Sequence, residues 1–234
     1  MSLCYFVTGT DTDVGKTFVA SALLARAGQL GLRTAGFKPV AAGAQTTAEG
    51  LRNGDALELM AAANQALPYE VVNPYCFEAA IAPHIAAAEQ GVAISVDGLM
   101  AAAGRFQATS ADFSLVEGAG GWRVPLNNQQ TFADFAVALN VPVIMVVAMR
   151  LGCINHALLT AEAIARDGLP LAGWVANQTG AEVMPHYRDN VRTLQAFLPA
   201  PLLGEIPYCP QKNIQEVAER LRLPREVGAT GQPL

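Results

Sequence analysis

The chain has 234 residues, of which 52% are hydrophobic and 15% charged, and its net charge is −5. This composition suits one α/β domain with a large core and excludes a disordered chain. Because Lys and Arg form no cluster, we expect no nucleic-acid partner. The longest apolar stretch, residues 141–149, is too short to cross a bilayer, and the N-terminus has no secretion-signal pattern. We therefore expect no membrane partner, a cytoplasmic location and reduced thiols at the four scattered cysteines.

Apolar runs of strand length alternate with segments of helical periodicity along the chain. The expected strands are residues 4–8, 34–40, 113–117, 142–147, 171–176 and 202–206. The expected helices are residues 16–30, 56–63, 96–105, 132–139, 154–166 and 184–198, while prolines break up residues 64–94. This alternation predicts an α/β fold, a three-layer parallel sheet with helices on both faces, whose ligands bind beyond the carboxyl ends of the strands. We expect residues 1–224 to form one domain and residues 225–234 a flexible tail.

The loop after the first expected strand ends in Gly15-Lys16-Thr17, at the start of the first helix. This strand–loop–helix context predicts a P-loop NTPase fold. Backbone N–H groups would cradle phosphate, Lys16 would reach the β- and γ-phosphates, and the Thr17 hydroxyl would bind Mg²⁺. The usual spacing is not met, because Thr10 stands at the first glycine position and Gly9 comes one residue early. The alternative is an ordinary glycine-rich turn with an incidental lysine.

Each acidic side chain near this loop has more than one interpretation. Asp11 and Asp13 either cap the helix, contact a cationic group, or are solvated loop acids. Glu117 ends an apolar strand just before a glycine-rich turn, which favours a metal-binding carboxylate over a surface acid. Asp55, from spacing alone, is more typical of an N-cap for the following helix.

Three further segments carry polar residues at expected strand ends. Lys38 lies in an apolar run, where it either neutralises developing negative charge or extends its ammonium to solvent. The turn 151–156 opens a helix, so its free N–H groups could bind a carboxylate with Asn155 as a contact, while Cys153 fits a small buried residue. Asn177 either reads adenine through its amide or serves turn chemistry.

Taken together, the chain resembles the dethiobiotin synthetase family over residues 3 to about 208. The P-loop variant alone indicates only a superfamily, whereas its combination with the lysine strand and the Leu-Gly-Cys-Ile-Asn turn is specific. The resembling segments are residues 7–17, 36–40, 50–56, 72–75, 82–84, 116–121, 151–156, 172–177 and 203–207.

The resemblance implies an enzyme that uses ATP, Mg²⁺, CO₂ and 7,8-diaminononanoate to form dethiobiotin, in a homodimer with substrate at the interface. It implies Lys16 and Lys38 as catalytic residues and Thr17, Asp55 and Glu117 as metal ligands. The implied ATP contacts are Asp13, Val14, Gly15, Lys16, Thr17, Phe18, Asp55, Glu117, Gly118, Ala119, Gly120, Asn177, Ile206, Pro207 and Tyr208. The implied substrate contacts are Thr12, Lys38 and Ala42, with Gly152, Cys153, Ile154 and Asn155 of the partner subunit. Two departures are Asp13, where the family often has Glu, and Ala42, where it often has a substrate-contacting serine.

Two other functions share this fold pattern. A P-loop ATPase switch acting on a protein or membrane partner usually carries a second lysine early in the loop, where this chain has Thr10-Asp11-Thr12. An ATP-dependent amide-forming ligase often carries a glutaminase domain, for which this chain has no room. Phosphate release that ignores the diamine and requires a protein partner would favour the switch.

Overall fold

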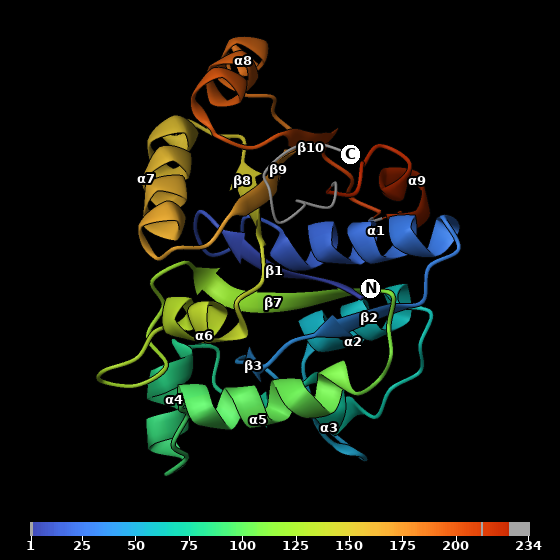
Figure 1. Ribbon diagram of the computed structural model, residues 1–234, viewed down its shortest axis with the longest axis vertical. Coiled ribbons are helices and arrows are strands. Elements are labelled where there is room, and N and C mark those ends of the chain that lie inside the picture. The colour runs from blue at the N-terminus through green and yellow to red at the C-terminus, as the bar shows by residue number, and fades with distance from the viewer. Residues whose placement is uncertain (1, 212, 225–234) are drawn as a thin grey trace.

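The computed structural model describes residues 2–211 and 213–224. Within these residues, six parallel strands form the central sheet in the order β10-β9-β8-β1-β7-β2 (Figure 1). Because the strands are parallel, their carboxyl ends meet at one edge of the sheet. The strands are β1 (Leu3–Gly9), β2 (Thr34–Phe37), β7 (Phe113–Gly121), β8 (Val143–Ala148), β9 (Leu171–Asn177) and β10 (Leu202–Ile206).

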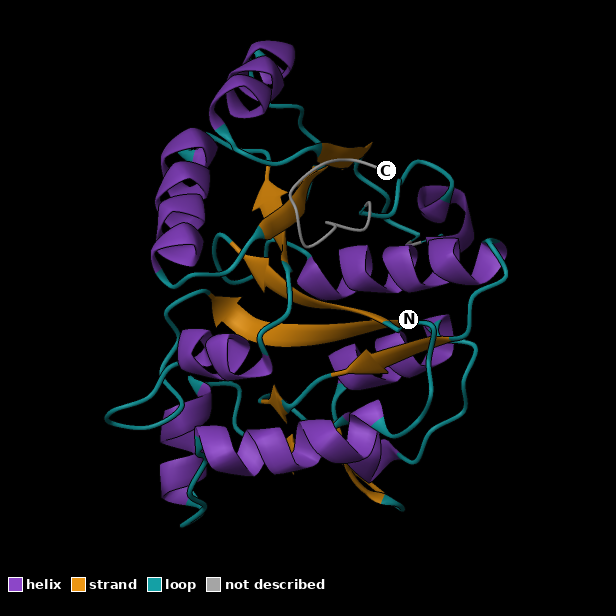
Figure 2. Ribbon diagram, in the orientation of Figure 1, coloured by secondary structure: helices purple, strands orange, loops and turns teal. Residues whose placement is uncertain are grey.

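Helices lie on both faces of this sheet, as Figure 2 shows. Side chains alternate between the two faces along a strand. In β1, Tyr5 and Val7 pack into the core that includes α1, α2 and α9, whereas Phe6 packs into the core that includes α4, α5 and α6. A third cluster joins β8 and β9 to α7 and α8. The bounds are α1 (Lys16–Gln29), α2 (Gly54–Ala62), α4 (Pro83–Glu89), α5 (Val96–Gln107), α6 (Phe132–Leu139), α7 (Cys153–Arg166), α8 (Tyr187–Phe197) and α9 (Ile214–Ala218). The three-layer α/β prediction is confirmed.

The segment between β2 and α5 forms smaller elements beside the carboxyl end of β2. The pair β3 (Val40–Ala41) and β6 (Tyr75–Cys76) is parallel, and β4 (Gln45–Thr47) forms a hairpin with β5 (Gly50–Arg52). A short helix, α3 (Tyr69–Val72), precedes β6. These elements bring residues 38–58 and 69–76 together beside β2, the last strand of the sheet, where β3 and α3 are labelled in Figure 1.

Two expected elements differ from the structure. The strand expected at 34–40 is divided, because Pro39 has no N–H and the Lys38 N–H donates to the Val72 carbonyl oxygen at 2.9 Å instead of to the sheet. The helix expected at 184–198 begins only at Tyr187. Pro185 disfavours a helical conformation at Met184, and His186 has a left-handed backbone with φ of 55°. The expected tail at 225–234 lies outside the described residues.

Two sequence expectations concern the chain as a whole. All four cysteines are free thiols, and only Cys153 among them is buried. In the portion of the chain that the structure describes, no helix is both long enough and apolar enough to span a membrane.

Candidate active site

The loop between β1 and α1 is shaped by two glycines. A Cβ at Gly9 would lie 2.5 Å from the Val14 side chain, so the close packing of the loop explains the early glycine. Gly15 has φ of 86°, and a Cβ there would collide with the Asn177 amide. Among the residues that the structure describes, no side chain accepts a hydrogen bond from the backbone N–H groups at the start of α1. Backbone N–H groups at this helix start can therefore face an anion, as a phosphate-binding loop requires.

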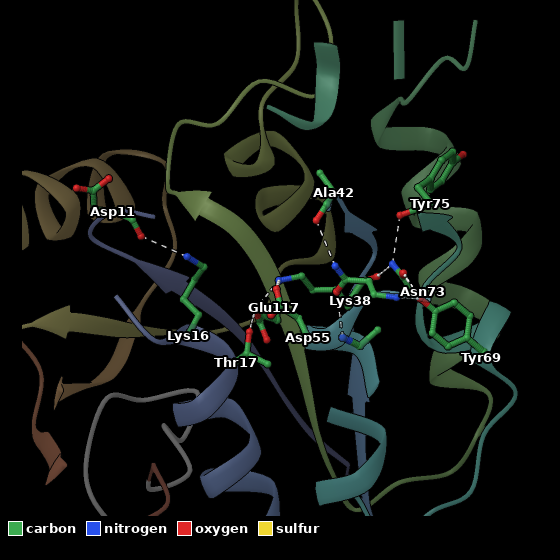
Figure 3. Close-up of polar contacts among 12 residues, drawn as sticks. Asp11, Lys16, Thr17, Lys38, Ala42, Asp55, Tyr69, Asn73, Tyr75 and Glu117 are labelled. Carbon is green, nitrogen blue, oxygen red and sulfur yellow. Dashed lines mark hydrogen bonds and ion pairs between the residues drawn. The ribbon is translucent and has the colours of Figure 1, made fainter. Parts of the chain in front are cut away.

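Lys16 begins α1 and is 7% exposed. Its Nζ donates a hydrogen bond to the carbonyl oxygen of Asp11 at 3.2 Å, back across the loop (Figure 3). Burial, followed by the nearby Lys38 ammonium, lowers the pKa of Lys16 to about 8. The Asp11 carboxylate accepts a hydrogen bond from the Thr12 N–H and forms an ion pair with Arg150 at 2.8 Å. Asp11 therefore connects the phosphate-binding loop to the turn that follows β8.

Lys38, which directly follows β2, lies between the carboxylates of Glu117, in the middle of β7, and Asp55, in the first turn of α2 (Figure 3). Its Nζ is 2.5 Å from Glu117 Oε1 and 2.9 Å from Asp55 Oδ2. The Thr17 hydroxyl also donates to Glu117 Oε1, at 2.8 Å. Lys38 and Glu117 are 3% and 0% exposed. Four parts of the fold, the end of β2, the middle of β7 and the first turns of α1 and α2, therefore bring these side chains to one point.

The charges of this cluster follow from burial and pairing. Burial lowers the pKa of Lys38, but the carboxylates of Glu117 and Asp55 outweigh burial and hold it above its ordinary value. Burial raises the pKa of Asp55, but Lys38 outweighs it and the net pKa is lowered. Burial raises the pKa of Glu117 against the attraction of Lys38. The cluster is thus an ammonium neutralised by carboxylates in a largely water-free setting.

Asp55 does not cap α2, which corrects the interpretation from spacing. The cap is Asn53, whose side chain accepts the Ala56 N–H at 3.3 Å and donates to the Ala42 carbonyl oxygen at 3.2 Å. Asp55 lies in the first turn, where a carboxylate is favoured by the helix dipole, and it is turned toward Lys38. Asp55 lies near Glu117 and Thr17, and the metal-binding role that the resemblance implies for these three residues stays a prediction.

The oxygen atoms of Thr17, Asp55 and Glu117 fit a divalent cation. Glu117 Oε2 is buried and has no hydrogen-bond partner among the described residues, so it is an unused ligand atom. Across that same part of the chain there is no cluster of three His, Cys, Asp or Glu residues. Mg²⁺ needs none, because it is commonly held by one or two carboxylates together with water and substrate phosphates.

These residues line a pocket of about 850 Å³. Most of the expected P-loop and substrate residues are in its lining, including Thr12, Phe18, Ala42, Ala119 and Gly120. The lining also contains residues that the sequence did not assign to the site: Ala41, Glu58, Ala80, Ile81, Ala82, Pro83 and Val124. Of these residues, only Ala82 and Pro83 could have been found from the sequence, because they lie in the resembling segment 82–84, to which no role was assigned.

Other expected nucleotide contacts lie around the loop rather than in this lining. Asn177 is buried, and its Nδ2 donates to the Val14 carbonyl oxygen at 2.8 Å. Ile206 is fully buried in the core beneath α1, so its side chain is not available as a wall for a base, whereas Pro207 and Tyr208 are exposed. Val14, in the loop itself, and Gly118, in β7, are both buried.

The turn at residues 152–155 lies outside the pocket lining of its own chain. Cys153 is buried, Gly152 and Asn155 are exposed, and Gly152 has φ of 93° at the start of α7. Leu151, next to this turn, is 95% exposed.

Comparisons with known proteins decide the family. A family model described as "AAA domain" matches residues 4–215. An ATP-dependent dethiobiotin synthetase from Cellvibrio japonicus is 57% identical over 219 residues, which is 94% of this chain and 95% of the relative. ATP-dependent dethiobiotin synthetases from Pseudomonas aeruginosa and Chromohalobacter salexigens are 53% and 51% identical, each over 94% of this chain and 96% and 98% of the relatives. The chain belongs to the AAA-domain family and, within it, to the dethiobiotin synthetases. The family predicted from the sequence is confirmed, and the chain is an ATP-dependent ligase.

Solved structures show the fold over almost the whole chain. The cell division protein MinD of Aquifex aeolicus matches with a TM-score of 0.58 at 14% identity, covering 94% of this chain and 88% of that one. MinD from Pyrococcus horikoshii, complexed with Mg-ADP, matches with a TM-score of 0.50 at 17% identity, covering 92% and 86%. Identities this low show a shared P-loop fold alone.

Proposed function

We propose that the pocket binds ATP, CO₂ and 7,8-diaminononanoate and forms dethiobiotin, ADP and phosphate. Family membership supports this proposal. The observation that carries it is the Lys38 ammonium, buried between two carboxylates beside a phosphate-binding loop. Phosphoryl transfer needs chiefly positioning and charge stabilisation, and this cluster offers both.

The reaction proceeds in three balanced steps. One amine of the diamine adds CO₂ and loses a proton, which gives a carbamate. A carbamate oxygen then attacks the γ-phosphorus of ATP, ADP leaves, and a carbamic–phosphoric anhydride forms. The second amine attacks the carbonyl carbon, expels phosphate and loses a proton, so that a cyclic urea closes.

The side chains of the pocket have distinct roles in this sequence. Lys16 binds phosphate oxygens, and Lys38 stabilises the negative charge of the carbamate and of the transferred phosphoryl group. Thr17, Asp55 and Glu117 hold Mg²⁺, which neutralises phosphate charge when bound. Asn177 reads the adenine, with Pro207 and Tyr208 beside it. Thr12, Ala42 and the glycines after Glu117 border the diamine, and the Ala42 position offers backbone contacts alone.

The proposal includes a homodimer. The turn at residues 152–155 of the partner subunit would bind the substrate carboxylate through backbone N–H groups and Asn155. The exposure of Leu151 beside this turn and the separation of the turn from the pocket of its own chain support this arrangement.

The deciding experiment is phosphate release from Mg·ATP, with and without 7,8-diaminononanoate and bicarbonate, with the product mass read alongside. Diamine-dependent release with a cyclic urea product is the expected result. Phosphate release that is indifferent to the diamine would leave the ATP site standing and overturn the synthetase reaction.

A further inference from the structure

A buried asparagine holds the backbone of Lys38 from behind the pocket (Figure 3). Asn73 is 3% exposed, and its Nδ2 donates to the Lys38 carbonyl oxygen at 2.6 Å and to the Tyr75 carbonyl oxygen at 3.2 Å. The Lys38 N–H donates to the Val72 carbonyl oxygen at 2.9 Å. Both peptide groups that flank the Lys38 Cα are therefore fixed by residues 72–73, after the chain has left the sheet.

Asn73 is itself fixed by a tyrosine. The Tyr69 hydroxyl donates to Asn73 Oδ1 at 2.9 Å and accepts the Asn53 N–H at 2.7 Å. Burial raises the pKa of Tyr69 to about 12, so the hydroxyl keeps its proton and donates at neutral pH. The guanidinium of Arg52 lies over the face of the Tyr69 ring, 4.3 Å from its centre, and this cation–π contact also fixes the ring.

Asn53 links the tyrosine to the remaining parts of the site. As the cap of α2 it sets the first helical turn, which carries Asp55, and its Nδ2 donates to the Ala42 carbonyl oxygen. One hydrogen-bonded chain, Asn73–Tyr69–Asn53, thus connects the backbone segments that carry Lys38, Ala42 and Asp55 (Figure 3). These three linking residues lie outside the pocket lining.

We propose that Asn73 and Tyr69 are positioning residues for the transfer step, which set the Lys38 ammonium against Asp55 and the substrate. This inference rests on the proposed function. The backbone N–H and C=O of Lys38 bond to Val72 and Asn73 and not to a neighbouring strand of the central sheet. The position of the Lys38 Cα, and with it the side chain, therefore depends on these two residues. A displacement of a reacting or stabilising group by about 1 Å can cost on the order of a hundredfold in rate. Many of the proposed Mg·ATP contacts lie on α1 and its loop, and this chain of hydrogen bonds reaches them only through Asp55 in the first turn of α2.

The test compares the purified full-length wild type with three variants in the diamine-dependent phosphate-release assay. Tyr69→Phe removes the hydroxyl and keeps the ring on Arg52. Asn73→Asp keeps an acceptor for Tyr69 and removes the N–H groups that hold Lys38. Tyr75→Phe is the matched control. It deletes a tyrosine hydroxyl from the same segment, but this hydroxyl lies next to Gly98 of α5 and away from the site. Thermal unfolding of each variant shows at which temperature the kinetics report folded protein.

We expect Tyr69→Phe to lower kcat about tenfold and Asn73→Asp about a hundredfold, with the KM for Mg·ATP changed less than about twofold. Tyr75→Phe should leave kcat unchanged. A folded Tyr69→Phe protein with wild-type kcat overturns the inference, as does a kcat loss matched by the control. If Asn73→Asp does not fold, Tyr69→Phe decides. A wild type without diamine-dependent release would instead reject the proposed function, so the two failures are distinguishable.

Discussion

Replacing Lys38 by methionine tests the charge cluster most directly, because it keeps the length of the apolar stem and removes the ammonium. Glu117 is 0% exposed and would lose its counter-ion, whereas the side chain of Asp55 is 47% exposed and stays solvated. Removing one partner of a buried ion pair costs about 3–5 kcal/mol. Because burial already raises the pKa of Glu117, its carboxyl can take up a proton and recover part of this cost. We expect a loss of about 3 kcal/mol in the free energy of unfolding.

The same substitution should lower kcat by about 10²- to 10³-fold, the usual effect of removing one preorganised stabiliser of developing negative charge. A second substitution separates stability from catalysis. In Lys38→Met combined with Glu117→Gln, the buried carboxylate is gone, and a neutral amide can still accept the Thr17 hydroxyl. We expect this double variant to regain most of the lost stability and none of the lost turnover.

Urea unfolding followed by circular dichroism gives the free energies, and diamine-dependent phosphate release gives kcat. A double variant as unstable as Lys38→Met would show that the unpaired Glu117 is not the source of the loss. Wild-type kcat in folded Lys38→Met would show that the ammonium does not stabilise the transfer step.

Three further predictions test the loop, the surface and the interface. Gly9→Ala should lower the free energy of unfolding by about 1–3 kcal/mol, because its Cβ meets packed atoms, whereas Gly104→Ala, in an exposed part of α5 with open space, should raise it by about 0.5–1 kcal/mol in the same urea titration. Hydrogen bonds from Arg33 hold the pKa of Asp112 far below its usual range, so its contribution is present above the unfolded pKa of about 4 and is lost as pH falls. The melting temperature of Asp112→Asn should therefore lie below that of the wild type at pH 7, and the gap should narrow as the pH falls below about 4 without closing at pH 3, because the folded carboxyl is still ionised there. A gap that does not change with pH would contradict the assignment. Asn155→Ala should weaken binding of the diamine in calorimetry and leave Mg·ATP affinity unchanged, and unchanged diamine affinity would remove this residue from the site.

The elements predicted most closely are those whose ends are marked by local chemistry. Helix α6 matches the expected residues 132–139, because Thr131 and Asp134 form a capping box at its start and Asn140 takes a left-handed conformation at its end. The strand at 202–206 lies between Pro201 and Pro207, which bound it on both sides. In such segments the neighbouring residues determine where the element stops.

Long-range contacts explain two of the errors, the divided strand and the cap of α2, whereas the late start of α8 follows from Pro185 and His186 next to it. Residues 34–40 are apolar enough for a continuous strand, but Val72 takes the N–H of Lys38 and draws the chain out of the sheet. Asn53 and Asp55 have similar capping chemistry, and Asn53 is the cap in the structure, where its amide also reaches Ala42. No local pattern predicts a contact to a residue so distant along the chain.

Because local patterns do not predict long-range contacts, some site residues could be predicted from the sequence and others could not. Lys16, Lys38 and Glu117 each lie at or after the end of an expected parallel strand, so a topological rule brings them to one edge before any contact is known. In the structure β7 continues to Gly121, so Glu117 lies within the strand. Asp55 required the family resemblance, because it follows only the β4–β5 hairpin. Asn73 acts on Lys38 across 35 residues, and its signal, an asparagine next to Pro74 in a broken segment, is equally typical of a turn.

Lys16 and Lys38 approach the pocket from different elements of the fold. Lys16 comes from α1 and is held on the Asp11 carbonyl oxygen, whereas Lys38 comes from the end of β2 and is held by Asp55 and Glu117. Their mutual repulsion contributes to the lowered pKa of Lys16, so placing them together has a cost in the folded protein. That cost is reversed when an anion binds between them, since each ammonium then gains an opposite charge. An arrangement of this kind favours a bound anion over the empty pocket, which supports the proposal that the phosphoryl group is transferred between α1 and β2.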